Sequence, residues 1–129
     1  MTDLAIVRQV DLDHDAAIER VTVTLQAEGF GILSTIDMAA KMKEKLGRAM
    51  PAYTILGACN PPLAWDAIHA QPDIGVMLPC NVCVTVDAQG RTILRAMRPQ
   101  VALQLLDDPV LARVAQDATA RLERAIAAV

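Results

Sequence analysis

The segment from Tyr53 to Thr85 contains all three cysteines, four of the seven prolines and the only tryptophan of the chain. It begins with an apolar run of strand length, Tyr53 to Ala58, which is followed closely by Asn60-Pro61-Pro62. Asparagine is a favoured N-cap residue, and a proline at the first helical position gives up an amide that has no partner there. We therefore expect a strand and then a helix that ends near Ala70.

Four other segments have the length and the apolar content of strands. Asp87-Ala88-Gln89-Gly90 has the residues of a tight hairpin turn between two of them. In another, Phe30, Ile32, Ser34 and Ile36 are expected on one face, because successive side chains of a strand alternate. The predicted strands are Leu4 to Val10, Phe30 to Ile36, Asn81 to Val86 and Arg91 to Ala96.

The stretch from His14 to Gly29 fits two periods. Alternating valine and leucine residues would suit a strand, whereas apolar residues three and four apart would suit a helix. The helical interpretation has better end signals, because Asp13 is a good N-cap and Gly29 can take a positive φ after the last turn. We favour the helix and keep the strand as the alternative. His14 is interpreted as a solvated helix start.

Shorter helices are predicted for Met38 to Leu46, between Asp37 and Gly47, and for Pro99 to Leu106. The apolar run from Ile74 to Leu78 is too short for a helix. A long C-terminal helix should begin at Pro109 and cover one face of the sheet. Its apolar stripe consists of Leu111, Val114, Ala115, Ala118, Leu122, Ala125 and Ile126.

The composition narrows the possible classes of function. The chain has 129 residues, 53% of them hydrophobic, so we expect a single domain over residues 1–129. A net charge of −3 without a basic cluster argues against nucleic acid as a partner. No apolar run approaches the length of a membrane span, so we expect no membrane partner and a cytoplasmic location. Three cysteines suit free thiols in a reducing compartment.

Two Cys-Asn dipeptides, Cys59-Asn60 and Cys80-Asn81, are the candidate ligand-binding residues. If the two segments meet in space, two thiols flanked by two amides could bind a small polar ligand or activate a nucleophile. Cys59 is the candidate catalytic residue, because it precedes the N-cap of a helix whose positive end would favour a thiolate. The competing interpretation is that Cys59 is a small buried apolar side chain.

Cys80 and Cys83 form a CxxC motif, which invites a redox interpretation. Residues three apart on a strand point to opposite faces, so a dithiol pair is disfavoured here. A zinc site would need Cys59, Cys80, Cys83 and His69, and their spacing matches no usual zinc pattern. We therefore predict no metal and no cofactor. Trp65 and His69 are interpreted as packing or surface residues.

Several segments resemble the family known as domain of unknown function 302: GFGILSTIDM (29–38), EKLG (44–47), YTILGACNP (53–61), LAWDAI (63–68) and IGVMLPCNV (74–82). The resemblance runs from about Asp13 to the C-terminus. It implies an α+β fold in which helices cover an antiparallel sheet, similar in topology to the TATA-binding-protein-like fold, and it implies homodimers. The shared Cys-Asn pairs of the family fall on the two dipeptides named above, whereas Cys83 departs from the pattern.

Three functions follow from these observations. The first is a homodimeric module that binds or senses a small ligand in a pocket lined by Cys59, Asn60, Cys80 and Asn81. The second is a thiol-dependent enzyme with Cys59 as the nucleophile. The third is a structural or protein-interaction module in which these residues cap a helix and fill the core.

Overall fold

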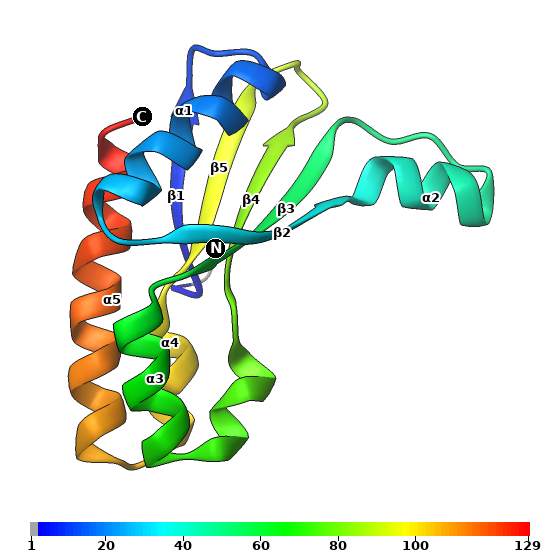
Figure 1. Ribbon diagram of the computed structural model, residues 1–129. Helices are drawn as coiled ribbons and strands as arrows, with labels where there is room; N and C mark the ends of the chain where they lie inside the picture. Colours follow the sequence, from blue (N-terminus) through cyan, green and yellow to red (C-terminus); the bar gives the residue numbers. More distant parts are fainter. Residues whose placement is uncertain (1–2) are drawn as a thin grey trace.

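A five-stranded sheet lies at the centre of the computed structural model, which describes residues 3–129 (Figure 1). The strand order is β1-β5-β4-β3-β2, and every neighbouring pair is antiparallel. The predicted α+β class, with a helix-covered antiparallel sheet and a long C-terminal helix, is confirmed; the TATA-binding-protein-like topology stays a prediction. The strands are β1 (Ala5–Val10), β2 (Gly31–Asp37), β3 (Tyr53–Cys59), β4 (Cys80–Val86) and β5 (Thr92–Met97).

The main helices begin where the sequence places N-cap side chains. Asp13 accepts a hydrogen bond from the amide of Ala16 at 2.8 Å, so the segment that fitted two periods is a helix. Asp108 likewise accepts from Val110 at 2.8 Å at the start of the C-terminal helix. The helices are α1 (His14–Ala27), α2 (Met38–Leu46), α3 (Pro61–Ala70), α4 (Pro99–Ala102) and α5 (Pro109–Ala127), with 3₁₀ helices η1 (Pro72–Met77) and η2 (Leu103–Leu105).

The apolar run around Ile74 is part of the 3₁₀ helix η1, so the expectation that it forms no helix was wrong. A 3₁₀ turn needs only three residues, and Pro72 at its start fixes a helical φ. The segment predicted as one short helix from Pro99 is likewise divided into α4 and η2. Both corrections concern single turns, which hydrophobic periodicity does not resolve.

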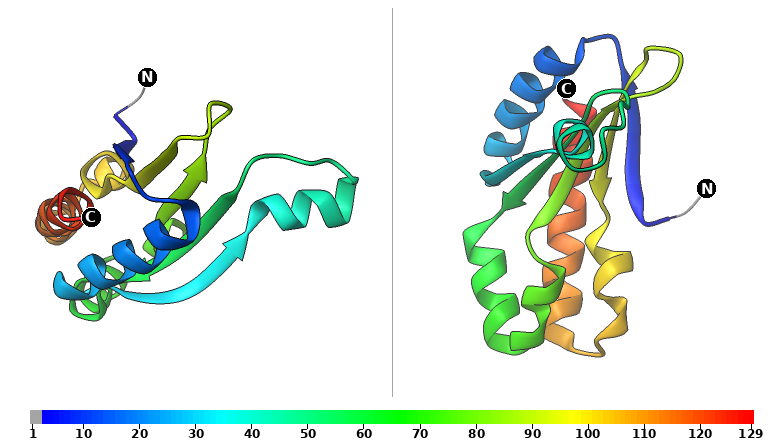
Figure 2. Two further views of the ribbon diagram at one scale, coloured as in Figure 1. Left: turned by 90° about the horizontal axis from the view of Figure 1, so that it is seen from above. Right: turned by 90° about the vertical axis from the view of Figure 1, so that its right-hand side faces the viewer.

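The core consists of two clusters, and α5 contributes to both. Its C-terminal half packs with α1 against one face of the sheet, and Leu122 and Ile126 are buried there with Leu94. Its N-terminal half extends past the end of the sheet, where Leu111 packs with Ile74 of η1. The long helix therefore covers the sheet with only half of its length, and its other half joins α3, α4 and η1 in a lower helical layer (Figures 1 and 2).

Helices α1 and α5 lie on the same face of the sheet (Figure 2). We call the opposite face the open face, because no helix within residues 3–129 covers it. Its residues include Val7 of β1, which is 58% exposed. None of the helices within residues 3–129 is both long enough and apolar enough to span a membrane.

A β-bulge in β2 changes the face that the second half of this strand presents. Ile32 is paired with Ala58, whereas Ser34 is paired with the preceding residue, Gly57, so Leu33 is the extra residue. An extra residue reverses the alternation beyond it. The expectation that Ile32 and Ser34 share a face was therefore wrong: Ile32 packs on the core, and Ser34 lies on the open face.

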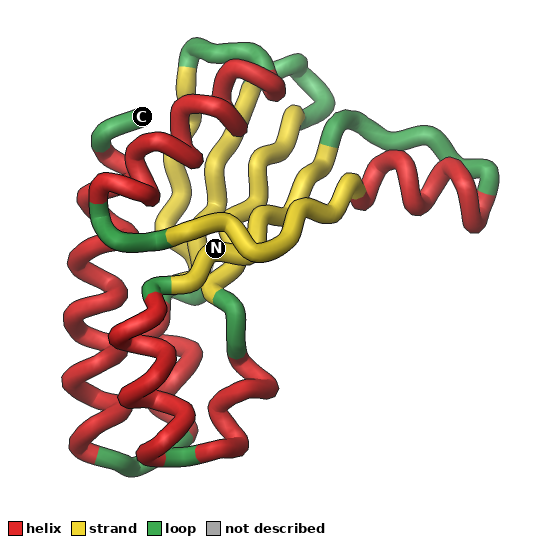
Figure 3. The backbone as a smooth tube through the Cα atoms, in the orientation of Figure 1, coloured by secondary structure: helices red, strands yellow, loops and turns green. Residues whose placement is uncertain are grey.

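Helix α2 and the loop that follows it form an arm that extends from the body of the molecule beyond the end of β2 (Figure 3). We define the arm as residues 38–52. Asp37 caps α2 and Gly47 ends it with φ +65°, as the sequence predicts. No residue of α2 is buried, and Leu46 is 59% exposed. The methionines and leucine at helical spacing on α2 thus have little of the chain packed against them.

Candidate functional site

A cavity of about 290 Å³ lies between the lower end of the sheet and the lower helical layer. Its wall combines the end of β3, the start of β4, one side of α3 and the N-terminal half of α5. The lining is almost wholly apolar, and Asn60 is its only amide side chain. The lining residues are Phe30, Leu33, Ala58, Cys59, Asn60, Leu63, Ala64, Ala67, Ile68, Leu78, Pro79, Cys80, Met97, Pro99, Leu103, Val114 and Ala118.

Two of the predicted thiols meet in this wall. Cys59 ends β3 and Cys80 begins β4; the register pairs Cys80 with Ala58, so Cys59 is offset by one residue from the direct partner of Cys80, and both cysteines line the cavity. Burial raises the pKa of the Cys80 thiol to about 11, and the nearby charge of an ionised Cys59 acts in the same direction. A thiol of this kind is almost wholly protonated near pH 7, so Cys80 acts as an apolar part of the wall.

Asn60 lines the cavity, but both ends of its amide are already engaged in local structure. Its Oδ1 accepts a hydrogen bond from the amide of Leu63 at 3.3 Å, which confirms the predicted N-cap of α3. Its Nδ2 donates to the carbonyl oxygen of Glu28 at 3.4 Å. Gly29, with φ +87°, passes so close that an added Cβ would lie 2.9 Å from this nitrogen. Asn60 therefore joins the end of α1 to the start of α3.

Asn81 lies apart from the other three predicted residues. It is exposed, it does not line the cavity, and it is paired with Gly57 on the open face. The side chain of Pro79 packs over Gly57, where an added Cβ would lie 2.8 Å from the proline Cγ and would also meet Ser34 Oγ. The structure thus brings together Cys59, Asn60 and Cys80 of the four candidates. Their role in binding a ligand stays a prediction.

Cys83 is separated from Cys80 by the sheet itself. Cys80 packs against the core, while Cys83, three residues along β4, lies on the open face. All three cysteines are free thiols. Within residues 3–129, no three histidine, cysteine or acidic side chains are grouped closely enough to hold a metal ion. The CxxC spacing therefore brings no two thiols together.

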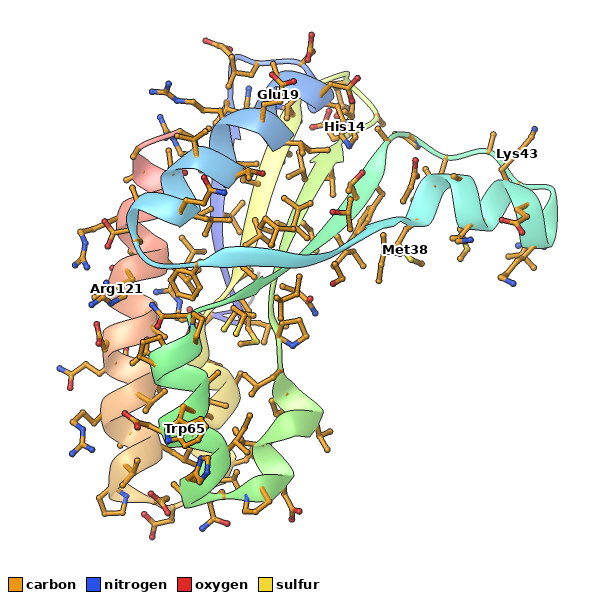
Figure 4. The ribbon with its side chains drawn as sticks, viewed as in Figure 1. His14, Glu19, Met38, Lys43, Trp65 and Arg121 are labelled. Atoms are coloured by element: carbon orange, nitrogen blue, oxygen red, sulfur yellow. The ribbon has the colours of Figure 1, made fainter. Side chains whose placement is uncertain are left out.

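The two histidines belong to helices at opposite ends of the molecule: Figure 4 labels His14 on α1 and Trp65, the stacking partner of His69, on α3. His69 stacks on Trp65 along α3, with ring centroids 4.1 Å apart, and Trp65 is 66% exposed, so the surface interpretation of this pair is correct. The solvated interpretation of His14 was wrong. Its side chain is only 20% exposed, and Nε2 lies 2.9 Å from the hydroxyl of Thr54 on β3.

The apolar character of the cavity was not predicted from the sequence, in which the two Cys-Asn pairs indicated a polar ligand. Much of the wall consists of apolar residues whose sequence pattern is also typical of an ordinary hydrophobic core, such as Leu63 and Ala67 on α3 and Ala118 on α5. Their apolar character suits core packing and cavity lining equally, so the sequence carries no signal that separates the two.

The comparisons with known proteins agree on one family. The family described as domain of unknown function DUF302 matches residues 6–129. A crystal structure of an uncharacterized conserved DUF302 protein from Bacillus stearothermophilus is similar, with a TM-score of 0.90 and 27% sequence identity over 98% of each chain. No curated protein matches the sequence. The match spans nearly the whole chain, and the chain belongs to the DUF302 family.

Proposed function

We propose that this chain is a homodimeric module that binds a small apolar molecule in the cavity beside Cys59 and Cys80. The observation that carries the proposal is the apolar wall of the 290 Å³ cavity. An engineered apolar cavity of about 150 Å³ holds benzene, so by proportion this one suits a ligand of roughly twelve non-hydrogen atoms. An apolar pocket of this size with few polar groups is typical of a ligand site.

The part-exposed Leu33 and Ile68 support an entry route, because both line the cavity and also reach the surface. Their side chains belong to the bulge of β2 and to α3, two separate elements of the cavity wall. A molecule that enters between them would contact apolar groups throughout. Asn60 would contribute little to recognition, because both ends of its amide are engaged.

The test is calorimetric titration with small uncharged aromatic probes, indole and naphthalene, on the wild type and on two cavity-filling variants. Ala118→Leu fills the cavity from α5, and Ala67→Leu fills it from α3. Ala112→Leu, an exposed position on α5, is the matched control. We expect binding by the wild type and the control, and a loss of at least about tenfold in affinity in a folded filling variant, since a leucine occupies most of the ligand volume.

Binding that is unchanged in both filling variants would place the probe elsewhere and reject the cavity as its site. The two variants approach from different walls, so one of them suffices if the other fails to fold. Far-ultraviolet circular dichroism and urea unfolding establish which variants are folded. Failure of both probes to bind the wild type would also count against the proposal.

The homodimer that the family resemblance implies is supported by the arm. A nine-residue helix is too short to be stable alone in water, and α2 receives little packing from its own chain. We infer that Met42 and Leu46 of α2 pack against a second copy. Native mass spectrometry of the wild type should give a dimer, which Met42→Glu weakens. Lys43→Glu, on the exposed polar side of the same helix, serves as the control.

A further inference from the structure

Four polar side chains gather on the open face of the sheet, away from the cavity. We call them the thiol cluster: Tyr53 on β3, Cys83 and Thr85 on β4, and Arg95 on β5. The register pairs Cys83 with Arg95, and it pairs Tyr53 with Thr85. Side chains of directly paired residues stand about 4.5–5.5 Å apart at Cβ, so the four form one continuous group.

The bonds within the thiol cluster give it a defined shape. Arg95 Nη1 donates to the hydroxyl of Thr85 at 2.7 Å, and that hydroxyl donates to the carbonyl oxygen of Ile93 at 3.1 Å. Tyr53 lies diagonally across the β3–β4 pair from Cys83, a spacing within reach of an aromatic side chain. The charge of Cys83 is the main cause that raises the pKa of Tyr53, followed by hydrogen bonding to Cys83 and by burial, while Arg95 opposes the rise. The phenol therefore keeps its proton and is a donor for the Cys83 sulfur.

Arg95 has a positive charge that no carboxylate within residues 3–129 neutralises. None of the ion pairs within residues 3–129 involves it, in contrast to Arg91, which is paired with Asp87 on the neighbouring hairpin. A guanidinium has five N–H donors, and the bond to Thr85 uses one of them. The remaining donors and the charge are available to an anion that approaches the open face.

We propose that Cys83 is a reactive thiol that accepts small anionic disulfides, with Arg95 binding the anionic group and the Tyr53 hydroxyl donating to the thiolate. The proton of the thiol passes to solvent, and the thiolate of Cys83 attacks one sulfur of the disulfide. The disulfide bond breaks, and a new sulfur–sulfur bond to Cys83 forms. The other half leaves as a thiolate with the electron pair, so Cys83 is oxidised as the disulfide is reduced.

This site is independent of the proposed cavity, because Cys83 lies on the other face of the sheet from Cys80. The surroundings of Cys83 differ from those of Cys59 and Cys80, which line an apolar wall that contains no cation. In the sequence, Cys59 is the favoured reactive thiol because of its place before a helix. The thiol cluster instead offers a cation and a hydroxyl donor around one half-buried cysteine on the open face.

The test compares the rates of two disulfide probes of opposite charge, Ellman's reagent as a dianion and cystamine as a dication, with the folded protein at low salt. Peptide mapping by mass spectrometry identifies the thiol modified first. We expect Cys83 to react first and to prefer the dianion by at least about fivefold, as expected for one cation at a part-exposed site. Arg95→Gln should abolish this preference, and Arg95→Lys should retain most of it.

Arg91→Gln is the matched control, because it removes one positive charge from the same sheet at a residue that already has a partner. Its charge preference should equal that of the wild type. First modification at Cys59 or Cys80 would overturn the proposal, and so would a Cys83 that is unreactive in the folded protein. An equal charge preference in the wild type and Arg95→Gln would remove Arg95 from the site.

Discussion

The side chain of Asn60 and the carbonyl oxygen of Glu28 are joined by a hydrogen bond of 3.4 Å, although 32 residues separate them. The same amide caps α3 through its Oδ1. One side chain therefore fixes the turn that ends α1 relative to the helix that borders the cavity. This arrangement gives a structural reason for an asparagine after Cys59 that is separate from any contact with a ligand.

Asn60→Ala should lower the free energy of unfolding by about 1–2 kcal/mol, because α3 loses its cap and Glu28 loses a partner. Urea unfolding followed by circular dichroism measures the change. Asn81→Ala is the control, since Asn81 occupies the equivalent place in the second Cys-Asn pair but is exposed. It should change stability by no more than about 0.5 kcal/mol. Equal losses in the two variants would contradict the structural role of Asn60.

Gly57→Ala should destabilise the fold, because the new methyl group would lie 2.8 Å from Pro79 and would also meet Ser34 Oγ. Overpacking of this kind costs about 1–3 kcal/mol. Gly31→Ala, in the neighbouring strand, is the matched control, since its Cβ would meet nothing within 4 Å. Thermal unfolding of both variants measures the difference. A Gly57→Ala protein as stable as the control would mean that Pro79 moves aside at no cost.

Cys80 gives the protein a stability term that depends on pH. Its pKa is raised from 9.0 to about 11 in the folded state, by burial first and then by Cys59. The folded state therefore holds the proton more tightly, and the resulting stabilisation is fully present below about pH 9 and is lost as the pH rises through about 11. The whole term is at most about 3 kcal/mol.

The measurement is the difference in free energy of unfolding between the wild type and Cys80→Ala, determined by urea unfolding at about pH 8 and about pH 11. The difference should shrink by about 1–3 kcal/mol over this interval, because only the wild type has the Cys80 thiol and loses the stabilisation that comes from its raised pKa. A difference that stays constant would show that Cys80 titrates alike in the folded and unfolded chains.

Local signals in the sequence predicted most of the fold. Asp13, Asp37, Asn60 and Asp108 each cap the helix that follows them, as expected for short side chains with an acceptor oxygen. The bulge at Leu33 could not be predicted, because it depends on the pairing of β2 with β3 and not on the composition of β2. The same is true of His14, whose partner Thr54 is 40 residues away.

The candidate site was predicted only in part, because the sequence does not give the register between the strands. Cys59 and Cys80 end and begin neighbouring strands, so their meeting depends on register alone, and the sequence left it open. The strand period did predict that Cys83 would lie on the other face. The surroundings of each thiol depend on other elements: the apolar wall beside Cys80 comes from α3 and α5, and the guanidinium beside Cys83 comes from β5, the next strand of the hairpin.

The last prediction concerns Arg8, which caps the C-terminus of α5 from β1. Its Nη1 lies 2.8 Å from the backbone oxygens of Ile126 and Ala127 and 2.9 Å from that of Val129. A cation there satisfies acceptors that the helix leaves without partners and opposes the negative end of its dipole. Arg8→Met should therefore cost about 1–2 kcal/mol of stability, in line with hydrogen bonds to a charged group.

Hydrogen exchange should locate this loss, because the amides of the last turn of α5 are the ones that fray when the cap is removed. Arg20→Met is the control: Arg20 is exposed on α1, and within residues 3–129 it has no ion pair or side-chain hydrogen bond. Faster exchange at the end of α5 in Arg8→Met, with Arg20→Met unchanged, is the expected result. Unchanged exchange in both would mean that packing of Leu122 and Ile126 holds the helix end without Arg8.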